Sequence, residues 1–186
     1  MRLFIASSFP EPVVRDLNER VNAIRSRLPA ASWVRPETQH LTYAFLGEQP
    51  EALVATLLPT LTAHLGKLPR FAATLDGAGF FPNPRRARVG WVGLLPEQNF
   101  SDIARTVRSV VTAAGVTLDR ADFKPHLTMM RMRDGWPPSS IDLFTRTLSH
   151  YRSEPFTMDH VTLYASELNP KGAVHTPVQK FALASV

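Results

Sequence analysis

Two copies of one tripeptide contain the residues of this chain that are best suited to chemistry. The first copy is His40-Leu-Thr42 and the second is His126-Leu-Thr128. Both lie in runs of apolar and β-prone residues, and side chains two positions apart on a strand point to the same face. The imidazole and the hydroxyl of each copy should therefore project together. A histidine exchanges a proton near neutral pH and a hydroxyl donates to an anionic oxygen, so two facing copies could supply an acid, a base and a cradle for one phosphate.

The matched pair favours a catalytic site over structural histidines. A single histidine on a strand is more often part of the core or the surface than a functional group, but here both copies share the central leucine and a strand-like continuation. The chain has no cysteine and lacks the His-Glu-x-x-His, Gly-x-Ser-x-Gly and Gly-x-x-x-x-Gly-Lys motifs. We expect no catalytic role for the remaining histidines, which are His64, His150, His160 and His175.

The composition indicates a folded protein that favours anionic partners. Of the 186 residues, 44% are apolar and 20% are charged, as in ordinary globular domains. The 21 Lys and Arg exceed the 16 Asp and Glu, giving a formal charge of +5, which favours a polyanion. We expect a group of basic residues near a phosphate site, with a solvated surface as the alternative for any one of them. They are Arg85, Arg86, Arg88, Lys124, Arg131 and Arg133.

No segment of the sequence indicates a membrane protein. The opening residues 1–6 are apolar but too short for a signal peptide. No apolar run approaches the roughly 20 residues of a spanning helix. We therefore expect a cytoplasmic protein that does not associate with a membrane.

The elements that must position the motifs follow from the spacing of the apolar residues. Strands are expected near 2–9, 33–34, 40–46, 70–75, 88–94, 124–131, 156–166 and 178–183. Helices are expected near 13–28, 53–65, 103–114 and 141–151. Ser8 and Glu11 have capping-box spacing before the first helix, and Pro59 should kink or split the second. Gly115 can end the third helix, and residues 77–84 form a Gly-, Phe- and Pro-rich connection.

The order of these elements indicates a duplicated unit. The two motif histidines are 86 positions apart, close to half of the chain. Similar strands and helices surround each of them, and no linker or low-complexity segment divides the chain. We therefore expect a single α+β domain over residues 1–186, made of two similar lobes with a cleft between them.

The quoted residues resemble those of the two-histidine (2H) phosphoesterases, and within them the LigT-like RNA 2′,3′-cyclic phosphodiesterases, also called 2′-5′ RNA ligases. The resemblance covers almost the whole chain, in the family's order and at its spacing. The matching segments are Met1–Ala6, Trp33–Pro36, His40–Gly47, Gly79–Arg85, Arg88–Trp91 and Lys124–Arg131. It implies an α+β, bilobal duplicated fold in which two antiparallel sheets line a central groove and helices lie outside.

The same resemblance implies roles for individual residues. The two motif histidines would be the catalytic pair, and Thr42 and Thr128 would hold the phosphate. Arg131 would add a cationic contact, and Phe45 would line a nucleotide pocket. Strand alternation would point Arg131 and Phe45 to the opposite face, because each lies an odd number of residues from its histidine. A β-bulge would be needed to turn them to the face of the histidine. For Phe45, packing in the core is the alternative. Tyr43 stands where the family more often has an aliphatic residue, and we expect it to change packing rather than chemistry.

The implied activity is hydrolysis of RNA 2′,3′-cyclic phosphate ends to 2′-phosphate ends, with no metal and no cofactor. We assign His126 as the base that activates water and His40 as the acid that protonates the 3′ oxygen; the near-symmetry of the motifs leaves the reverse assignment open. Run backwards, the site would act as a 2′-5′ RNA ligase. The expected partner of this monomer is RNA with 2′,3′-cyclic phosphate ends, tRNA fragments included, and Trp33 and the Phe80-Phe81 pair could stack on its bases.

Two other functions would use the same residues. One is an RNA-end-binding module without turnover, which the positive charge supports. The other is a phosphodiesterase acting on a small cyclic nucleotide such as ADP-ribose 1″,2″-cyclic phosphate. A test for product formation separates the first from an enzyme, and a comparison of oligonucleotide with mononucleotide substrates separates the second.

Overall fold

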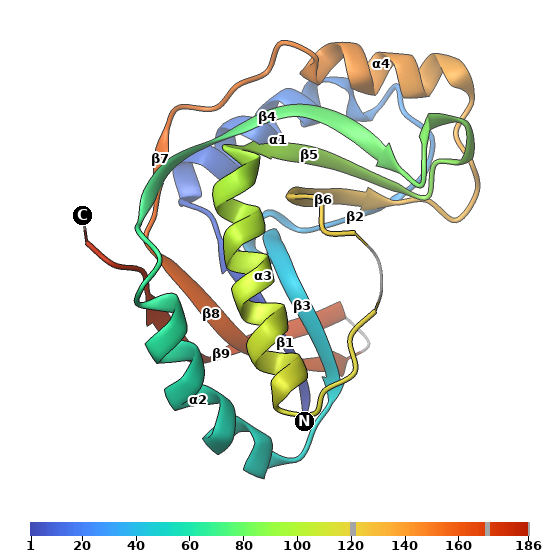
Figure 1. Ribbon diagram of the computed structural model, residues 1–186. Helices are drawn as coiled ribbons and strands as arrows, with labels where there is room; N and C mark the ends of the chain where they lie inside the picture. The colour runs from blue at the N-terminus through green and yellow to red at the C-terminus, as the bar shows by residue number, and fades with distance from the viewer. Residues whose placement is uncertain (120–121, 170–171, 186) are drawn as a thin grey trace.

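Two antiparallel sheets, one in each lobe, form the framework of the molecule (Figure 1). The computed structural model describes residues 1–119, 122–169 and 172–185. In the described chain the strand order is β3-β1-β8-β9 in the first sheet and β2-β6-β5-β4-β7 in the second. The α+β, two-lobed architecture expected from the sequence is therefore confirmed.

The first sheet contains the first motif. β3 (His40–Glu48) and β8 (His160–Asn169) pair with opposite sides of β1 (Arg2–Ser8), and β9 (Gly172–Ala182) pairs with β8. β1 suits the middle of the sheet because five successive residues in it are buried, as in a strand covered on both faces.

The second sheet contains the second motif. Its strands, in sheet order, are β2 (Ser32–Trp33), β6 (His126–Arg131), β5 (Val89–Leu95), β4 (Phe71–Phe81) and β7 (Phe156–Met158). β5 lies at the centre and again has five successive buried residues. β6 lies between β5 and the short edge strand β2; the second motif pairs with β5, whereas β2 pairs only with Met130 and Arg131 after it.

Helices cover the outside of the sheets. α2 (Glu51–Leu65) and α3 (Glu97–Ala113) pack against each other on the side of the first sheet, and α1 (Glu11–Arg25) and α4 (Pro138–Leu148) pack together on the side of the second (Figure 1). Short 3-10 turns, η1 (Pro36–Thr38) and η2 (Pro84–Arg86), complete the described elements. Apolar faces of the helices join one hydrophobic core that extends through both lobes. None of the described helices combines the length and the apolarity that a membrane crossing requires.

The chain crosses between the lobes repeatedly. β1 lies in the first sheet, but α1 and β2, which follow it, belong to the second lobe, and β3 returns to the first. After β4 and β5 have added to the second sheet, α3 packs against β3, and β6 and α4 belong to the second lobe again. Each lobe is thus built from both halves of the sequence.

Among the expectations about the helices, the cap at Ser8 was wrong, a split at Pro59 does not occur, and the end at Gly115 is confirmed. The capping box at Ser8 does not form, because the chain is still in β1 there and α1 begins at Glu11 with Pro10 as its N-cap and no side-chain cap. Pro59 does not split α2, which is one helix whose leucine face is buried in the core. Tertiary packing outweighs the missing hydrogen bond at proline. Gly115 does end α3, with a φ of +88°.

The strands are longer than the alternation of apolar residues suggests. β4 runs on to Phe81, so most of the expected connection over 77–84 is strand, with a register shift between Asp76 and Ala78 where Gly77 has a φ of +63°. β9 begins at Gly172 rather than near 178. These extensions are stabilised by hydrogen bonds to a neighbouring strand, and the alternation of apolar residues along one strand does not show such pairing.

Candidate active site

A groove between the lobes brings the two motifs together. β3 and β6 contact each other there, although they belong to different sheets. The groove has a volume of about 340 Å³. Its lining includes every residue expected at the site, namely His40, Thr42, Phe45, His126, Thr128 and Arg131.

Arg131 reaches the groove because β6 carries a bulge. Thr128 and Met130 pair with consecutive residues of β5, so Met129 is an extra residue in the strand. Met129 and Met130 are both buried. Two successive residues facing the core reverse the alternation that follows, and Arg131 returns to the face of the motif.

Phe45 is placed by the equivalent bulge in β3. Thr42 and Ala44 pair with consecutive residues of β1, which makes Tyr43 the extra residue. Tyr43 and Ala44 are buried, whereas the side chain of Phe45 is 59% exposed. Core packing of Phe45 is therefore ruled out. Phe45 and Arg131 each lie five positions after their histidine, so the two lobes present an aromatic ring and a cation from corresponding places.

Both histidine rings are oriented by a backbone carbonyl. Nδ1 of His40 lies 2.7 Å from the carbonyl oxygen of Thr38, and Nδ1 of His126 lies 2.7 Å from that of Lys124. A carbonyl oxygen only accepts hydrogen bonds, so Nδ1 carries a proton and donates it in both cases. Nε2 is left as the nitrogen that gains or loses a proton.

Aromatic neighbours from other strands of the same sheet pack against each histidine. The ring of His40 lies 5.0 Å from that of Phe4 and 5.4 Å from that of His175. The ring of His126 lies 4.9 Å from that of Phe81, edge to face at 86°. This packing restricts the rings to one orientation and excludes part of the water around them.

The surroundings of the two histidines favour their neutral forms. Burial lowers the pKa of His40, and the charges of His175 and Arg131 lower it further. Burial also lowers the pKa of His126, and Arg131 and Lys124 add to the effect. The carbonyl hydrogen bonds act in the opposite direction but are smaller. Both imidazoles can therefore accept a proton at neutral pH, and an anion bound between them would raise both pKa values.

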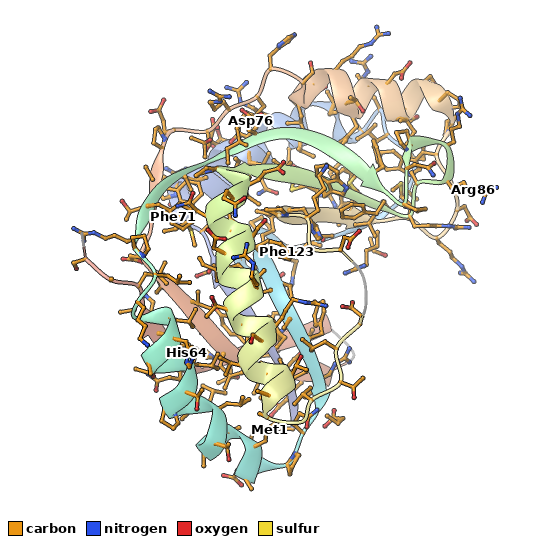
Figure 2. The ribbon with its side chains drawn as sticks, viewed as in Figure 1. Met1, His64, Phe71, Asp76, Arg86 and Phe123 are labelled. Carbon is orange, nitrogen blue, oxygen red and sulfur yellow. The ribbon has the colours of Figure 1, made fainter. Side chains whose placement is uncertain are left out.

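Only part of the expected basic group lies at the groove. Lys124 and Arg131 line it. Arg86, in η2, lies at the outer edge of the molecule in Figure 2, far from the central Phe123. Arg88 donates a hydrogen bond to the backbone oxygen of Arg133, and both are exposed. Arg85, Arg86, Arg88 and Arg133 do not line the groove; the first three lie in and after the exposed turn that follows β4, and Arg133 lies beyond the end of β6.

Of the aromatic residues expected to stack on RNA, again only some line the groove. Phe81 lines the groove, whereas Phe80 is only 4% exposed and belongs to the core. Trp33 is half-buried, packs 6.3 Å from Trp136 and lies under the guanidinium of Arg25. Trp33 does not line the groove but lines a second cavity beside it.

Several residues of the groove carried no recognisable sequence signal. Arg108 of α3 is paired with Asp119 at 3.2 Å, and both line the groove together with Asp122. Phe123 stacks 6.0 Å from the ring of Tyr43 and lies near the middle of the molecule (Figure 2). Asp119, Asp122 and Phe123 lie between α3 and β6, outside any helix or strand, so no periodicity indicates which way their side chains point. His175 was given no role, yet it contacts His40 from β9, a strand distant in sequence.

Tyr43 serves packing, as its position in the sequence led us to expect. Its ring is 1% exposed. Its hydroxyl shares a 3.1 Å hydrogen bond with Ser7 Oγ, which in turn donates to the backbone oxygen of His160. The hydroxyl is thus satisfied inside the first lobe and does not face the groove.

The described residues contain no group of three or more His, Cys, Asp or Glu side chains arranged to hold a metal ion. The two motif histidines have no such companions within the part of the chain that the structure covers.

Comparison with known proteins identifies the family. The model for LigT-like phosphoesterases matches the chain twice, over residues 8–91 and 92–175. This chain belongs to the LigT-like phosphoesterase family. The RNA 2′,3′-cyclic phosphodiesterase of Thermus thermophilus is 34% identical to it, over 98% of this chain and 90% of that protein.

Solved structures agree with this assignment. A protein of Thermus thermophilus superposes with a TM-score of 0.80 at 29% identity, over 100% of this chain and 99% of that one. LigT of E. coli, solved in complex with 3′-AMP, superposes with a TM-score of 0.75 at 26% identity, over 98% of this chain and 97% of that one. The two family matches also confirm the duplication, and they divide the chain within β5. Because each lobe contains elements from both halves of the sequence, one sequence repeat does not correspond to one lobe.

Proposed function

We propose that this protein hydrolyses RNA 2′,3′-cyclic phosphate ends to 2′-phosphate ends. The observation that carries the proposal is the meeting of two His-x-Thr pairs in one groove, each histidine with Nε2 as its proton-exchanging atom. The relatives named RNA 2′,3′-cyclic phosphodiesterase, in Thermus thermophilus and Archaeoglobus fulgidus, support the same activity.

In the proposed reaction the two histidines move one proton each. Nε2 of His126 takes a proton from water as the water oxygen bonds to phosphorus. The bond between phosphorus and O3′ breaks, and His40, protonated on Nε2, gives its proton to O3′. The product has a 3′-hydroxyl and a 2′-phosphate. Burial and nearby positive charges lower the pKa of both histidines, so the identity of the product, and not the pKa directions, tests which histidine is the base.

The remaining groove residues stabilise the charge on the phosphoryl group. The hydroxyls of Thr42 and Thr128 project from the same strand faces as the histidines and donate to the non-bridging oxygens. Arg131 supplies a positive charge at the same place. Donors that are already in position lower the barrier without a metal ion.

The first test is incubation of the protein, in excess EDTA, with a short RNA ending in a 2′,3′-cyclic phosphate. We expect a 2′-phosphate product. His40→Ala and His126→Ala should each lower the rate on the order of 10²-fold or more, because each removes an acid or a base. Circular dichroism checks that both variants remain folded.

The matched control is His150→Ala, because His150 is exposed and lies outside the groove. It should retain the wild-type rate. Full activity in His126→Ala, or loss of activity in EDTA, would contradict the proposal. A 3′-phosphate product would keep the enzyme but reverse the orientation of the substrate between the two histidines.

A small cyclic nucleotide is the second candidate substrate. LigT of E. coli has been solved in complex with NADP⁺ and with ATP, which supports a groove of this kind accepting nucleotides other than RNA. ADP-ribose 1″,2″-cyclic phosphate would then be hydrolysed faster than an RNA end. If the protein is instead an RNA-end-binding module, it should bind the RNA end without forming any hydrolysis product.

The proposal also covers the reverse reaction, the oligomeric state of the protein and its location in the cell. Run backwards, the site would join a 2′,3′-cyclic phosphate to a 5′-hydroxyl as a 2′-5′ linkage, and the high concentration of water favours hydrolysis. One chain supplies both motifs, which supports a single domain over residues 1–186 that works as a monomer. We place it in the cytoplasm, acting on RNA ends that include those of tRNA fragments.

A further inference from the structure

A second cavity opens directly from the catalytic groove. Its volume is about 690 Å³, and it shares His40, Phe45 and Arg131 with the groove. Its other walls come from β1, from the segment around η1 and from β9. The proposed hydrolysis uses none of these walls, yet they continue the surface on which the phosphate would lie.

The second cavity is positively charged. Arg2 and Arg35 line it in addition to Arg131, and no carboxylate of a described residue does so. The side chain of Arg35 lies 3.6 Å from that of Glu37, which is outside the cavity, and both are mainly exposed. An exposed pair of this kind is weak, so the guanidinium can exchange Glu37 for a phosphate.

The part of the groove that the second cavity does not share is mixed in charge. It is lined by Asp119 and Asp122 as well as Lys124, and its Arg108 is already paired with Asp119. Carboxylates repel a phosphodiester, whereas arginine binds one through charge-assisted hydrogen bonds. An RNA chain that places its end in the groove would therefore leave through the second cavity.

Ring faces accompany these arginines. Trp33 and His175 line the second cavity, and Phe45 stands at its border with the groove. Arg35 is close enough to His175 to lower the pKa of that histidine. Aromatic rings beside basic groups are the arrangement on which single-stranded nucleic acids stack without regard to sequence.

We propose that the second cavity binds the nucleotide on the 5′ side of the terminal one, with Arg2 and Arg35 on the phosphodiester that joins the two. This inference rests on the proposed function and narrows its substrate class. The site is built for the end of an RNA chain and not for a free cyclic mononucleotide.

The test compares two substrates that differ by one nucleotide. They are adenosine 2′,3′-cyclic phosphate and the dinucleotide ApA ending in a 2′,3′-cyclic phosphate. For the wild type we expect kcat/KM to be about 10-fold or more higher for the dinucleotide. Arg35→Ala and Arg2→Ala should each lower the dinucleotide value about 10-fold, as expected for the loss of a charged hydrogen bond, and leave the mononucleotide value unchanged.

Two further variants serve as controls. Arg86→Ala removes an exposed arginine outside both cavities and should leave both substrates unaffected. Arg35→Lys keeps the charge and should retain part of the preference for the dinucleotide. An equal loss on both substrates in Arg35→Ala would place the terminal nucleotide itself in the second cavity and overturn the inference. No loss on the dinucleotide would overturn it as well.

A binding measurement separates this inference from the proposed function. Calorimetry with ApA carrying a 2′-phosphate end and with adenosine 2′-phosphate requires no turnover. If neither cyclic substrate is hydrolysed, the proposed function fails, but tighter binding of the dinucleotide that Arg35→Ala abolishes would still support the second cavity. Equal affinities for the two ligands would contradict it whatever the activity.

Discussion

At the scale of single residues, each of the two motif histidines can change its charge only at Nε2, because a carbonyl oxygen holds the proton on Nδ1. Burial lowers the pKa of both rings from the ordinary value of 6.5. For the free enzyme kcat/KM rises with pH as the base loses its proton and falls as the acid loses its own. Both limbs of the profile should therefore lie below pH 6.5.

Two neighbouring cations allow the limbs to be assigned. The charge of His175 lowers the pKa of His40, and that of Lys124 lowers the pKa of His126. Removing either charge raises the pKa of its partner. If His40 is the acid and His126 the base, His175→Gln should move the alkaline limb of kcat/KM to higher pH, and Lys124→Gln should move the acidic limb to higher pH.

The measurement is the pH profile of kcat/KM for the wild type and the two variants. The position of a limb reports a pKa even where the variant also changes the maximal rate. An exchange of the two shifts would show that His40, and not His126, has the lower pKa of the two. Limbs that stay in place in both variants would contradict the electrostatic coupling.

Sequence reasoning predicted that the two His-x-Thr pairs lie together, because each pair is made of neighbouring residues and the pattern occurs twice, and the structure brings both pairs into one groove. It also placed Phe45 and Arg131, on condition that each strand carried a bulge. It missed His175, whose contact with His40 depends on how β9 lies in the first sheet. It also missed Arg108 and Asp119, which meet through a loop without periodicity.

At the scale of elements, β5 positions the second motif by lying close to β4 on one side and β6 on the other. Gly93 pairs with His126 in β6 and faces Asp76 in β4. A Cβ at position 93 would come 2.7 Å from the backbone oxygen of Asp76, which is tighter than packed atoms tolerate. The glycine allows β4 and β5 to approach each other beside the catalytic histidine.

Two substitutions on β5 should therefore differ in their effect on stability. Gly93→Ala forces a backbone oxygen to move and should lower the free energy of unfolding by about 2–3 kcal/mol. Gly90→Ala is the matched control, because its Cβ would meet the flexible end of Met130, and it should cost less than about 1.5 kcal/mol. Urea unfolding measures both. Equal losses would show that β4 and β5 can separate without strain.

Strand ends were the least predictable part of the fold. The pattern of apolar residues located each helix and part of each strand, but it joined β7 and β8, which belong to different sheets, into one strand over 156–166. It did not show that β4 continues through residues 77–81, since glycines in that segment look like a turn until their partner strand is known. It also suggested a cap at Ser8, where the backbone is still committed to pairing in β1.

At the scale of the whole molecule, the two lobes share one hydrophobic core and one interleaved chain. Neither lobe consists of a continuous half of the sequence, so neither lobe can unfold without disrupting the chain segments that belong to the other. The sequence predicted a duplicated unit because the motifs repeat at half the chain length. It could not show the interleaving, which exists only in the pairing of distant strands.

The interleaving predicts a single unfolding transition. Trp33, Trp91 and Trp136 all lie in or against the second sheet, so tryptophan fluorescence reports the second lobe, whereas far-ultraviolet circular dichroism reports both. We expect the two signals to change together in urea. A fluorescence transition at a different urea concentration from the dichroism transition would show that the lobes unfold independently.

The central place of β1 also has a consequence for synthesis on the ribosome. β1 precedes every other strand in the chain, yet it pairs with β8 from Arg2 with Ser166 to Ala6 with Thr162. One of its two partner strands is therefore translated near the end of the chain, and such distant pairing is slow to form. A nascent chain that stops after Arg131 already contains both motifs but lacks β8 and β9. Translation must run on well past the second motif before the first sheet, which holds the first motif, can be completed.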